Sequence, residues 1–250
     1  MTVTVLGSGT CVPLPARAAP GYLVRIGETP ILVDAGPGTL ARLSASGVSY
    51  KDLAVVLVSH LHPDHTLDLA TLLQACNSTP GFRRSLPLTF VGCRGLSSFI
   101  SRLFEIYEGI EPEGYALEVR EMGAETTSYP PGWTLTTDLS GHTLSSLCFR
   151  FEWGDRVLAY SGDASSAGRL ARLARGADLL ICECALPDGW SVPDHLNAGQ
   201  VGEIAREAGV GRVVLTHLYP PSQEADVVTQ VRERYGGQVS LASDGWTTTV

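Results

Sequence analysis

Hydrophobic and polar positions along the chain change their spacing in a regular order: short apolar runs are followed by segments in which apolar residues recur every three or four positions. The short runs are typical of strands and the wider spacing of helices. In the first half we expect strands at Thr2–Leu6, Tyr22–Ile26, Ile31–Val33, Leu53–Val58 and Leu88–Val91, and helices at Thr39–Ser46, Leu67–Ala75 and Leu96–Tyr107. The uninterrupted run Leu53–Val58 indicates a strand buried on both faces.

The second half repeats this order of elements. We expect strands at Leu147–Glu152, Arg156–Tyr160, Asp178–Cys182, Arg212–Thr216, Gln238–Leu241 and Trp246–Val250, and helices at Ala167–Ala174, Ala198–Ala208 and Ala225–Tyr235. No linker, charge block or low-complexity segment divides the chain, so residues 1–250 are expected to form a single domain.

Two pairs of segments are alike across the halves. Tyr22–Asp34 and Cys148–Asp163 each read as a hairpin that ends on an aspartate, while Ala54–His60 and Arg212–His217 each read as a buried strand that ends on a histidine. Two similar halves rich in strands, with helices between the strands, predict an α/β fold in the form of a four-layer αββα sandwich. Its strand ends should meet at one edge.

Composition limits the class of protein. The chain has 250 residues, of which 44% are hydrophobic and 18% are charged, so it can bury a sizeable core and is not typical of a disordered protein. Eighteen basic against 26 acidic residues give a net charge of −8, which argues against generic nucleic-acid binding. No apolar run reaches the roughly 20 residues of a membrane span, and the N-terminus lacks a signal-peptide pattern. We therefore expect a cytoplasmic protein that does not bind membranes.

The cysteines do not indicate a metal site or a disulfide framework. All six are scattered along the chain, which is typical of reduced, mostly buried thiols. Cys182 and Cys184 form a C-x-C pair, but no second pair accompanies them, so they are a weak candidate for structural zinc.

Three of the six histidines lie in one short segment. His60, His62 and His65, with Asp64 among them, directly follow the buried strand. In a tight loop leaving a strand, His60 and His62 can point to one side and chelate one cation, while Asp64 and His65 turn toward a second position. Imidazole and carboxylate ligands suit Zn²⁺ best, and Mn²⁺ or Fe²⁺ less well.

Further ligands must come from distant parts of the chain. His142, Asp163 and His217 all lie at expected strand ends or hairpin exits. Asp163 follows a strand and a Ser-Gly pair, so its carboxylate can bridge two ions. The sequence therefore predicts a site for two divalent metal ions.

These residues, with their spacing, resemble the metallo-β-lactamase fold superfamily. The resemblance covers nearly the whole chain, including the opening Leu6-Gly-Ser-Gly-Thr10, the hairpin end Val33-Asp-Ala-Gly36 and the closing Asp244-Gly245. It implies a first metal held by His60, His62, His142 and Asp163. It implies a second metal held by Asp64, His65, Asp163 and His217.

Two features resemble one branch of that superfamily, ribonuclease Z and related phosphodiesterases. The segment His142–Arg150 is similar to the one around their third histidine. Glu183 and His195 are similar to their glutamate–histidine pair, in which the histidine assists catalysis without binding metal. Ribonuclease Z, however, carries a long arm that clamps transfer RNA between the residues matching His142 and Asp163, and only 20 residues separate them here. The closer match is the arm-less phosphodiesterase-like hydrolases, some of which act on cyclic nucleotides.

The resemblance implies a binuclear hydrolase in which a hydroxide shared by the metals attacks a small phosphodiester. Asp64 would orient that hydroxide, and His195, directed by Glu183, would bind a phosphoryl oxygen or protonate the leaving group. The alternatives are hydrolysis of a thioester, lactone or lactam on the same metals, ribonuclease Z-type cleavage of tRNA at its 3′ end, and a metal-binding protein without turnover. Relatives often dimerise, so the resemblance also implies a homodimer.

Three residues are weaker candidates for contacts with the substrate phosphate. They are Ser146, Arg150 and Arg17. For Arg150, which lies on an expected hairpin strand, cross-strand pairing is favoured over contact with phosphate. We expect Asp34 and Asp244 to orient metal ligands or cap turns, as supporting carboxylates do.

Overall fold

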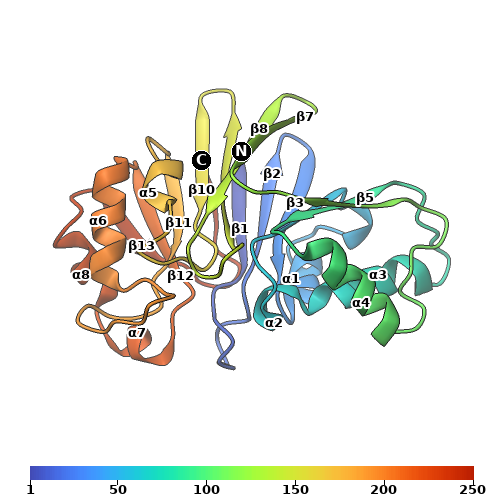
Figure 1. The fold of residues 1–250 in the computed structure, drawn as a ribbon, viewed down its shortest axis with the longest axis horizontal. Helices are drawn as coiled ribbons and strands as arrows, with labels where there is room; N and C mark the ends of the chain where they lie inside the picture. Colours follow the sequence, from blue (N-terminus) through green and yellow to red (C-terminus); the bar gives the residue numbers. More distant parts are fainter.

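Two β-sheets pack face to face, each covered on its outer side by helices (Figure 1). This architecture is seen in a computed structural model that describes residues 1–250. The first sheet contains, in spatial order, β14 (Thr247–Thr249), β1 (Thr2–Gly7), β2 (Gly21–Ile26), β3 (Thr29–Ala35), β4 (Val55–Val58), β5 (Leu88–Gly92) and β6 (Leu117–Glu121). The second contains β13 (Gln238–Leu241), β12 (Arg212–Thr216), β11 (Leu179–Glu183), β10 (Arg156–Tyr160), β9 (Leu147–Trp153), β8 (Trp133–Leu139) and β7 (Glu125–Tyr129).

The helices divide between the two outer faces. Those of the first sheet are α1 (Thr39–Ala45), the 3-10 turn η1 (Tyr50–Asp52), α2 (Pro63–Thr66), α3 (Asp68–Ser78) and α4 (Leu96–Ile106). Those of the second are α5 (Leu170–Leu173), α6 (Ala198–Ala208), α7 (Pro220–Glu224) and α8 (Val227–Arg232). None of these helices has the length and apolar character needed to span a bilayer.

The hydrophobic core has three parts, one for each boundary between layers. The part between the sheets contains aromatic side chains from both, among them Tyr22, Trp133, Phe149 and Phe151. A second part lies between the second sheet and its helices, and a third between the first sheet and its helices. Three buried boundaries define four layers, which confirms the predicted αββα sandwich.

Some elements differ from the prediction. Strands β6, β7 and β8 were not expected, because β6 and β7 carry partly exposed charged and hydroxyl side chains instead of an apolar run. The expected helix Ala225–Tyr235 begins only at Val227, since Asp226 caps it by accepting a hydrogen bond from the Thr229 amide. The expected helix Ala167–Ala174 shortens to α5.

The two halves are related, but one of the two expected likenesses is wrong. Each sheet runs from a meander into parallel strands, so β2–β3 occupies the place in the first sheet that β9–β10 occupies in the second. By the same order, β4 matches β11, and β12 matches β5. The strands before His60 and His217 are therefore not equivalent. They look alike because any short parallel strand buried on both faces reads as an apolar run.

The parallel strands place polar residues at one edge of the sandwich. Strands β3 to β6 run parallel to one another, as do β10 to β13. Ligand sites in open parallel sheets lie beyond the carboxyl ends of the strands. His60 follows β4, Asp163 follows β10 and His217 follows β12 at those ends.

Candidate metal centre

The segment after β4 supplies four side chains in two directions. His60 and His62 lie in the extended loop, and α2 begins directly after them with Pro63 at its first position, which proline favours. The helical turn carries Asp64 and His65 toward a second, neighbouring position, with the centroid of the His65 ring still 4.2 Å from that of His60. Because the backbone changes direction here, the segment supplies side chains to two neighbouring positions at which a cation could bind.

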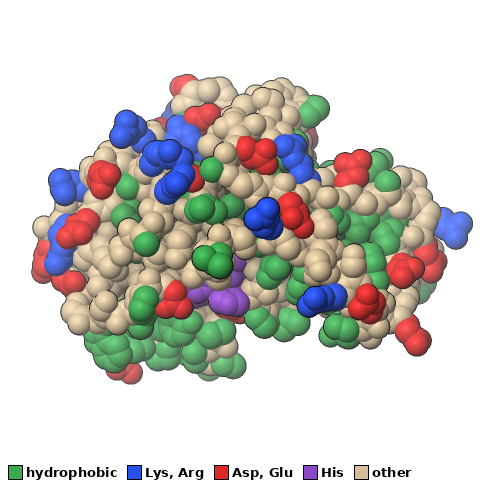
Figure 2. Space-filling view, viewed as in Figure 1, with side chains coloured by type: hydrophobic (Ala, Val, Ile, Leu, Met, Phe, Trp, Pro, Cys, Tyr) green, Lys and Arg blue, Asp and Glu red, His purple; other side chains and the backbone are tan.

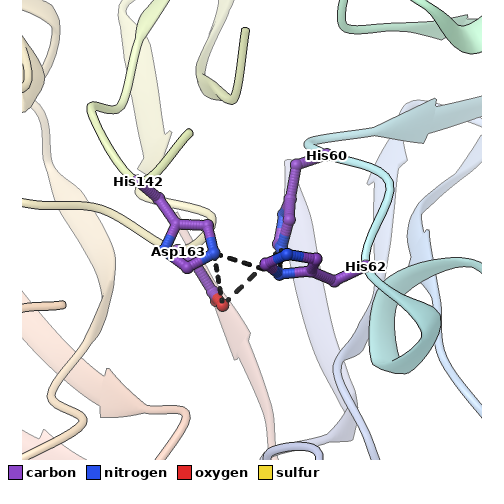
Figure 3. A group of neighbouring side chains, drawn as sticks. All are labelled: His60, His62, His142 and Asp163. Carbon is purple, nitrogen blue, oxygen red and sulfur yellow. Dashed lines mark hydrogen bonds and ion pairs between the residues drawn. The ribbon is translucent and has the colours of Figure 1, made fainter. Parts of the chain in front are cut away.

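At the first position, four ligand atoms gather (Figure 3). His62 Nδ1 lies 3.1 Å from His60 Nε2 and 3.1 Å from His142 Nε2. The Asp163 Oδ2 atom lies 3.7 Å from His60 Nε2 and 3.8 Å from His142 Nε2. Ligands placed 2.0–2.1 Å from a tetrahedral zinc are separated from one another by about 3.3–3.4 Å. The spacing of these four atoms therefore fits a single cation at their centre.

At the second position the other carboxylate oxygen of Asp163 takes part. Asp163 Oδ1 lies 3.2 Å from His65 Nε2 and 3.3 Å from His217 Nε2. The Asp64 Oδ2 atom lies 3.7 Å from His65 Nε2 and 3.5 Å from His217 Nε2. Asp163 thus faces both positions, one oxygen to each.

Buried atoms without hydrogen bonds mark the second position as a place for a cation. His65 Nε2, His217 Nε2 and Asp163 Oδ1 are buried, and none has a hydrogen-bond partner. Unpaired buried polar atoms are costly, and here they converge on one point. A divalent cation would satisfy all three, so the residues present fit a metal ion.

The structure brings together all the residues predicted as ligands. Each position takes two residues from the segment after β4 and two from the second sheet. His142 comes from the loop between β8 and β9, and Asp163 and His217 from the ends of β10 and β12. His217 has a left-handed backbone with φ of 54°, and its amide donates to the Ser8 carbonyl. Neither half alone offers more than two side chains to a position.

The protonation of the histidines suits cation binding. Burial, followed by the charge of the neighbouring His65, lowers the pKa of His60 well below its usual value, so the ring is neutral and can act as a ligand. Burial by itself would lower the pKa of His65, but the Asp163 and Asp34 carboxylates raise it well above its usual value. A cation at the second position must therefore displace a proton from His65.

Asp34 is the carboxylate that orients this group of residues. It accepts hydrogen bonds from the Ser59 amide and hydroxyl, both at 2.8 Å, and from the Tyr160 hydroxyl at 2.7 Å. Its Oδ2 also lies 2.8 Å from His65 Nδ1, which directs the opposite nitrogen of that ring at the second position. Asp244, by contrast, accepts from the Ser8 and Ala18 amides and fixes the loop after β1.

Glu183 and His195 form a pair beside the metal centre. His195 Nδ1 lies 3.0 Å from Glu183 Oε2, and the glutamate is fully buried. The His195 ring stacks near His142 and His217, with centroids 4.7 and 5.6 Å away. Burial alone would lower the pKa of His195, but the hydrogen bond to Glu183 raises it to about 9. His195 therefore carries a proton at neutral pH, and its Nε2 remains free for a substrate.

Two of the three predicted phosphate contacts are wrong. The Ser146 hydroxyl is buried, accepting from the Thr143 amide at 2.8 Å and bonding Ser140 Oγ, so it shapes the loop of His142. Arg150 points to the outer face of the second sheet, where it donates to the carbonyls of Leu173 and Arg175. It thereby braces α5 against the sheet, and it does not pair across strands either.

Arg17 remains near the metal centre. Its Nη1 donates to Ser8 Oγ at 2.7 Å and to the Ala242 carbonyl at 2.8 Å. The same side chain lines a cavity whose wall includes Asp64. Contact between Arg17 and a substrate therefore stays a prediction.

Sequence reasoning missed the tyrosines around the metal centre. Tyr160 from the second sheet bonds Asp34 of the first, and Tyr22 from the first sheet bonds Thr216 of the second at 2.7 Å. A tyrosine at a core-facing strand position needs a hydrogen-bond partner for its hydroxyl. That requirement was the only feature of the sequence that could have indicated a role for Tyr22 and Tyr160. Tyr219 packs edge-on against His195 and His217 and had no such signal.

The histidines are visible in a hollow of the molecular surface. Figure 2 shows them surrounded mainly by hydrophobic side chains, with arginines scattered over the face and mostly next to acidic residues. The centre is therefore open to solvent but has no continuous basic band beside it.

Comparison with known proteins shows what this chain is similar to. The family model described as "Beta-lactamase superfamily domain" matches residues 29–218. Ribonuclease Z from Mycobacterium sp. (strain KMS) is 30% identical over 97% of this chain and 93% of its own length. Uncharacterized protein Rv1339 from Mycobacterium tuberculosis is 31% identical over 95% of this chain and 88% of its own length.

Solved structures with a similar fold include proteins of the same kind. The metallo-β-lactamase fold protein YhfI from Bacillus subtilis is 26% identical and superimposes with a TM-score of 0.85 over 99% of this chain and 98% of its own. The short form of human tRNase Z is 24% identical with a TM-score of 0.80, covering 100% of this chain and 99% of its own, and this likeness concerns the fold.

Proposed function

Because the chain belongs to the β-lactamase superfamily of metal-dependent hydrolases, we propose that it hydrolyses small phosphodiesters at two divalent cations. Zinc is the first candidate, with manganese or iron as alternatives. His60, His62, His142 and Asp163 would hold the first cation. Asp64, His65, Asp163 and His217 would hold the second.

Two bound cations would lower the pKa of a water between them and offset charge on the phosphoryl oxygens. The residues of the chain supply orientation and a proton. Asp64 Oδ2 faces the second position, which leaves Oδ1 free to accept a hydrogen bond from the attacking water. Protonated His195 donates from Nε2 to the leaving oxygen, and Glu183 stabilises the protonated ring before transfer.

The observation that carries this proposal is the Glu183–His195 pair. Seven side chains suffice to hold two cations, and this pair adds a proton donor beside them. One ring nitrogen of His195 lies within 4.8 Å of the ligand atoms of Asp163 and His217. An alkoxide leaving group needs a proton, so a positioned acid is well suited to cleavage at phosphorus.

A small substrate is supported by the shape and charge of the chain. The 20 residues between His142 and Asp163 form only the hairpin β9–β10 and its connections. No arm extends from this place to hold a long polyanion. The net charge of −8 and the scattered arginines around the centre also disfavour binding to an RNA backbone.

A second candidate function is ribonuclease Z-type cleavage of RNA. It is favoured by the identity to proteins named ribonuclease Z, which extends over 93% of the length of one such relative. Cleavage of precursor tRNA uses the same reaction at phosphorus. The two candidates therefore differ in substrate size and not in the chemistry of the centre.

The test is a substrate screen coupled to metal analysis. Zinc-loaded protein should hydrolyse bis(4-nitrophenyl) phosphate and cyclic nucleotides, and leave precursor tRNA, thioesters, lactones and lactams unchanged. Cleavage of the tRNA at its 3′ end would establish the second candidate. Activity confined to the carboxylic substrates would overturn both.

His195→Ala tests the role of the proton donor. We expect turnover to fall by about 10²–10⁴ while zinc content stays at the wild-type value, because His195 is not a ligand. His142→Ala is the matched comparison, and it should lose zinc as well as activity. Loss of zinc from His195→Ala would show that the assigned role is wrong.

A further inference from the structure

A cavity of about 940 Å³ lies at the edge of the second sheet opposite the metal centre. It extends across the amino ends of the parallel strands β10 to β13, because residues at or next to the start of each strand line it. Figure 1 shows the nearby end of the chain at the edge opposite α2 and α7. We call this space, whose wall carries Arg156, Arg212 and Arg232, the amino-end cavity. Its volume lies within the range of small-molecule sites, roughly 300–1,000 Å³.

The charged side chains of the amino-end cavity are mostly basic. Its three arginines share the wall with one side-chain carboxylate, that of Asp178. Asp178 Oδ1 lies 3.8 Å from Arg156 Nη1, and Oδ2 accepts a hydrogen bond from the Val157 amide at 2.8 Å. Arg212 and Arg232 bond only to uncharged oxygens. In a chain with 26 acidic and 18 basic residues, this uncompensated positive charge in one cavity favours an anion from outside.

Two of the guanidiniums are held in place and still have free N–H groups. Arg212 donates from Nη1 to Thr248 Oγ1 at 3.0 Å and from Nη2 to the Thr249 carbonyl, which leaves Nε. Arg232 donates from Nη2 to the Val239 carbonyl at 2.9 Å, which leaves Nε and Nη1. Neutral acceptors position a guanidinium without cancelling its charge. The remaining donors suit the oxygens of a phosphate group.

Two adjacent glycines add backbone donors to the wall. The amides of Gly236 and Gly237 donate no hydrogen bond within the chain, and both residues line the amino-end cavity. A Cβ atom on Gly237 would lie 2.2 Å from the Tyr235 hydroxyl oxygen. Tyr235 is buried and donates to the Val210 carbonyl at 2.8 Å, so its ring leaves no room for a side chain at residue 237. A backbone without side chains lets an anion approach its amides closely.

We propose that the amino-end cavity binds a small oligophosphate, a ligand with at least two linked phosphate groups. The cavity is larger than a single phosphate, and its three guanidiniums come from β10, β12 and α8. Linked phosphates carry enough charge and enough oxygens to meet all three together with the glycine amides. This inference does not depend on the proposed hydrolysis, because no predicted ligand of the cations lines the cavity.

The experiment follows the amide signals of Gly236 and Gly237 by two-dimensional NMR while inorganic pyrophosphate is added to zinc-loaded protein. These two signals report on the amino-end cavity itself, whether or not the ligand also binds at the cations. We expect them to show an affinity at least about tenfold higher for pyrophosphate than for inorganic phosphate. Shifts confined to residues around the metal centre, or equal affinity for the two ligands, would overturn the proposal.

Variants test which side chains bind the ligand. Arg156→Gln and Arg232→Gln should each weaken pyrophosphate binding by about tenfold, because each removes a charged donor from the cavity. The Arg156 side chain is 51% exposed, so its replacement should leave the fold intact. The matched control is Arg102→Gln, since Arg102 is exposed on α4 and lies outside the cavity. An equal loss of affinity in all three variants would show attraction by net charge alone and would overturn the proposal.

A short single-stranded RNA is the last comparison. With a net charge of −8 on the chain, we expect the RNA to leave the Gly236 and Gly237 signals unshifted at concentrations at which pyrophosphate saturates them. RNA binding tighter than that of pyrophosphate, weakened by Arg156→Gln and Arg232→Gln, would assign the cavity to a nucleic-acid backbone and overturn the proposal. Hydrolysis of bis(4-nitrophenyl) phosphate should be the same in wild type and Arg156→Gln, so failure of the cavity proposal and failure of the proposed function are seen separately.

Discussion

Tyr160 connects the two sheets through a single hydroxyl. Its donation to Asp34 reaches a carboxylate that also holds Ser59 and His65. Its ring remains in the core against Tyr22 and Phe149. The hydroxyl can thus be removed without removing the ring, which makes this residue a direct probe of the orientation of His65.

Tyr160→Phe should weaken zinc binding at the second position by roughly 10–100-fold, the usual effect of losing a group that orients a ligand. Zinc affinity is measured by competition with a chromogenic chelator. The control is Tyr235→Phe, which removes a similar buried hydroxyl bonded to the Val210 carbonyl. That variant should lose about 1 kcal/mol of stability and keep its zinc affinity. Unchanged affinity in Tyr160→Phe would contradict the role of Asp34 as the orienting group.

His195 should show a pH dependence set by its carboxylate partner. In metal-free protein its ring is expected to lose its proton at a pKa of about 9, and Glu183→Gln should lower that pKa. Because the folded-state pKa exceeds the unfolded value of about 6.5, the stabilisation is fully present below pH 6.5. It is lost as pH rises through about 9.

Imidazole proton NMR follows the titration, and denaturant unfolding at several pH values follows the stability. Glu183→Gln is the comparison in both measurements. A His195 ring that titrates at 6.5 or below in the wild-type chain would contradict the prediction.

At this scale, the sequence predicted the ligands better than the substrate contacts. His60, His62, Asp64 and His65 share one short segment, and packing requirements alone rarely bring histidines together at that spacing. Ser146 and Arg150 lie close to His142 in the sequence, but the Ser146 hydroxyl turns into its own loop and Arg150 points to the outer face of β9. The direction of a side chain depends on the fold of its loop or the face of its strand, and spacing along the chain gives neither.

Among the elements, α2 packs closely against the end of β3. It packs beside Gly36, where an added Cβ would lie 2.0 Å from the Asp64 carbonyl oxygen. The turn that carries Asp64 and His65 can approach β3 only because residue 36 has no side chain. The place of the second cation position therefore depends on a glycine that contributes no ligand.

Gly36→Ala should push α2 away from β3. We expect a loss of about 1–3 kcal/mol in the free energy of unfolding, as for other overpacked sites, together with reduced zinc content. Gly123→Ala is the control, because its Cβ would meet no atom within 4 Å and its φ is not in the left-handed range. Equal stability and zinc content in the two variants would show that the close approach is relaxed in solution.

Clear patterns of apolar residues predicted most of the strands and helices. Elements with few apolar residues were not predicted. The buried parallel strands β4, β11 and β12 were visible as apolar runs, whereas β6 and β7 at the sheet edges have too few apolar residues to be seen. Similar apolar runs also led to a wrong prediction, because β4 and β12 have similar sequences but occupy different places in their sheets. Burial fixes the composition of a strand, whereas its position follows from pairing between distant segments.

For the whole molecule, the cations should act as a link between the sheets. Each position takes two ligands from the segment after β4 and two from the second sheet. Removing zinc with a chelator should lower the melting temperature by roughly 5–10 °C, the size expected for a ligand present at 100 times its Kd. Adding zinc back should restore it, as differential scanning calorimetry can show. No change on chelation would mean that the cations bind too weakly to couple the sheets.

Of the properties of the whole molecule, the homodimer depended on the resemblance, whereas the layers did not. The four layers followed from the alternation of strands and helices. The single domain, the homodimer and the choice of zinc over manganese or iron stay predictions. They depend on surfaces and ligand exchange that neither hydrophobic spacing nor the interior of one chain determines.

The equal sharing of ligands also has a consequence for synthesis on the ribosome. His60 and His62 emerge early, whereas His217 emerges after every other ligand. A nascent chain that has made only β1 to β6 presents at most two ligands at each position, and a bidentate site of this kind exchanges ions freely. If the chain holds two cations as proposed, their firm loading must wait until the second sheet has been translated and has docked, so metallation would belong to the last stage of the protein's maturation.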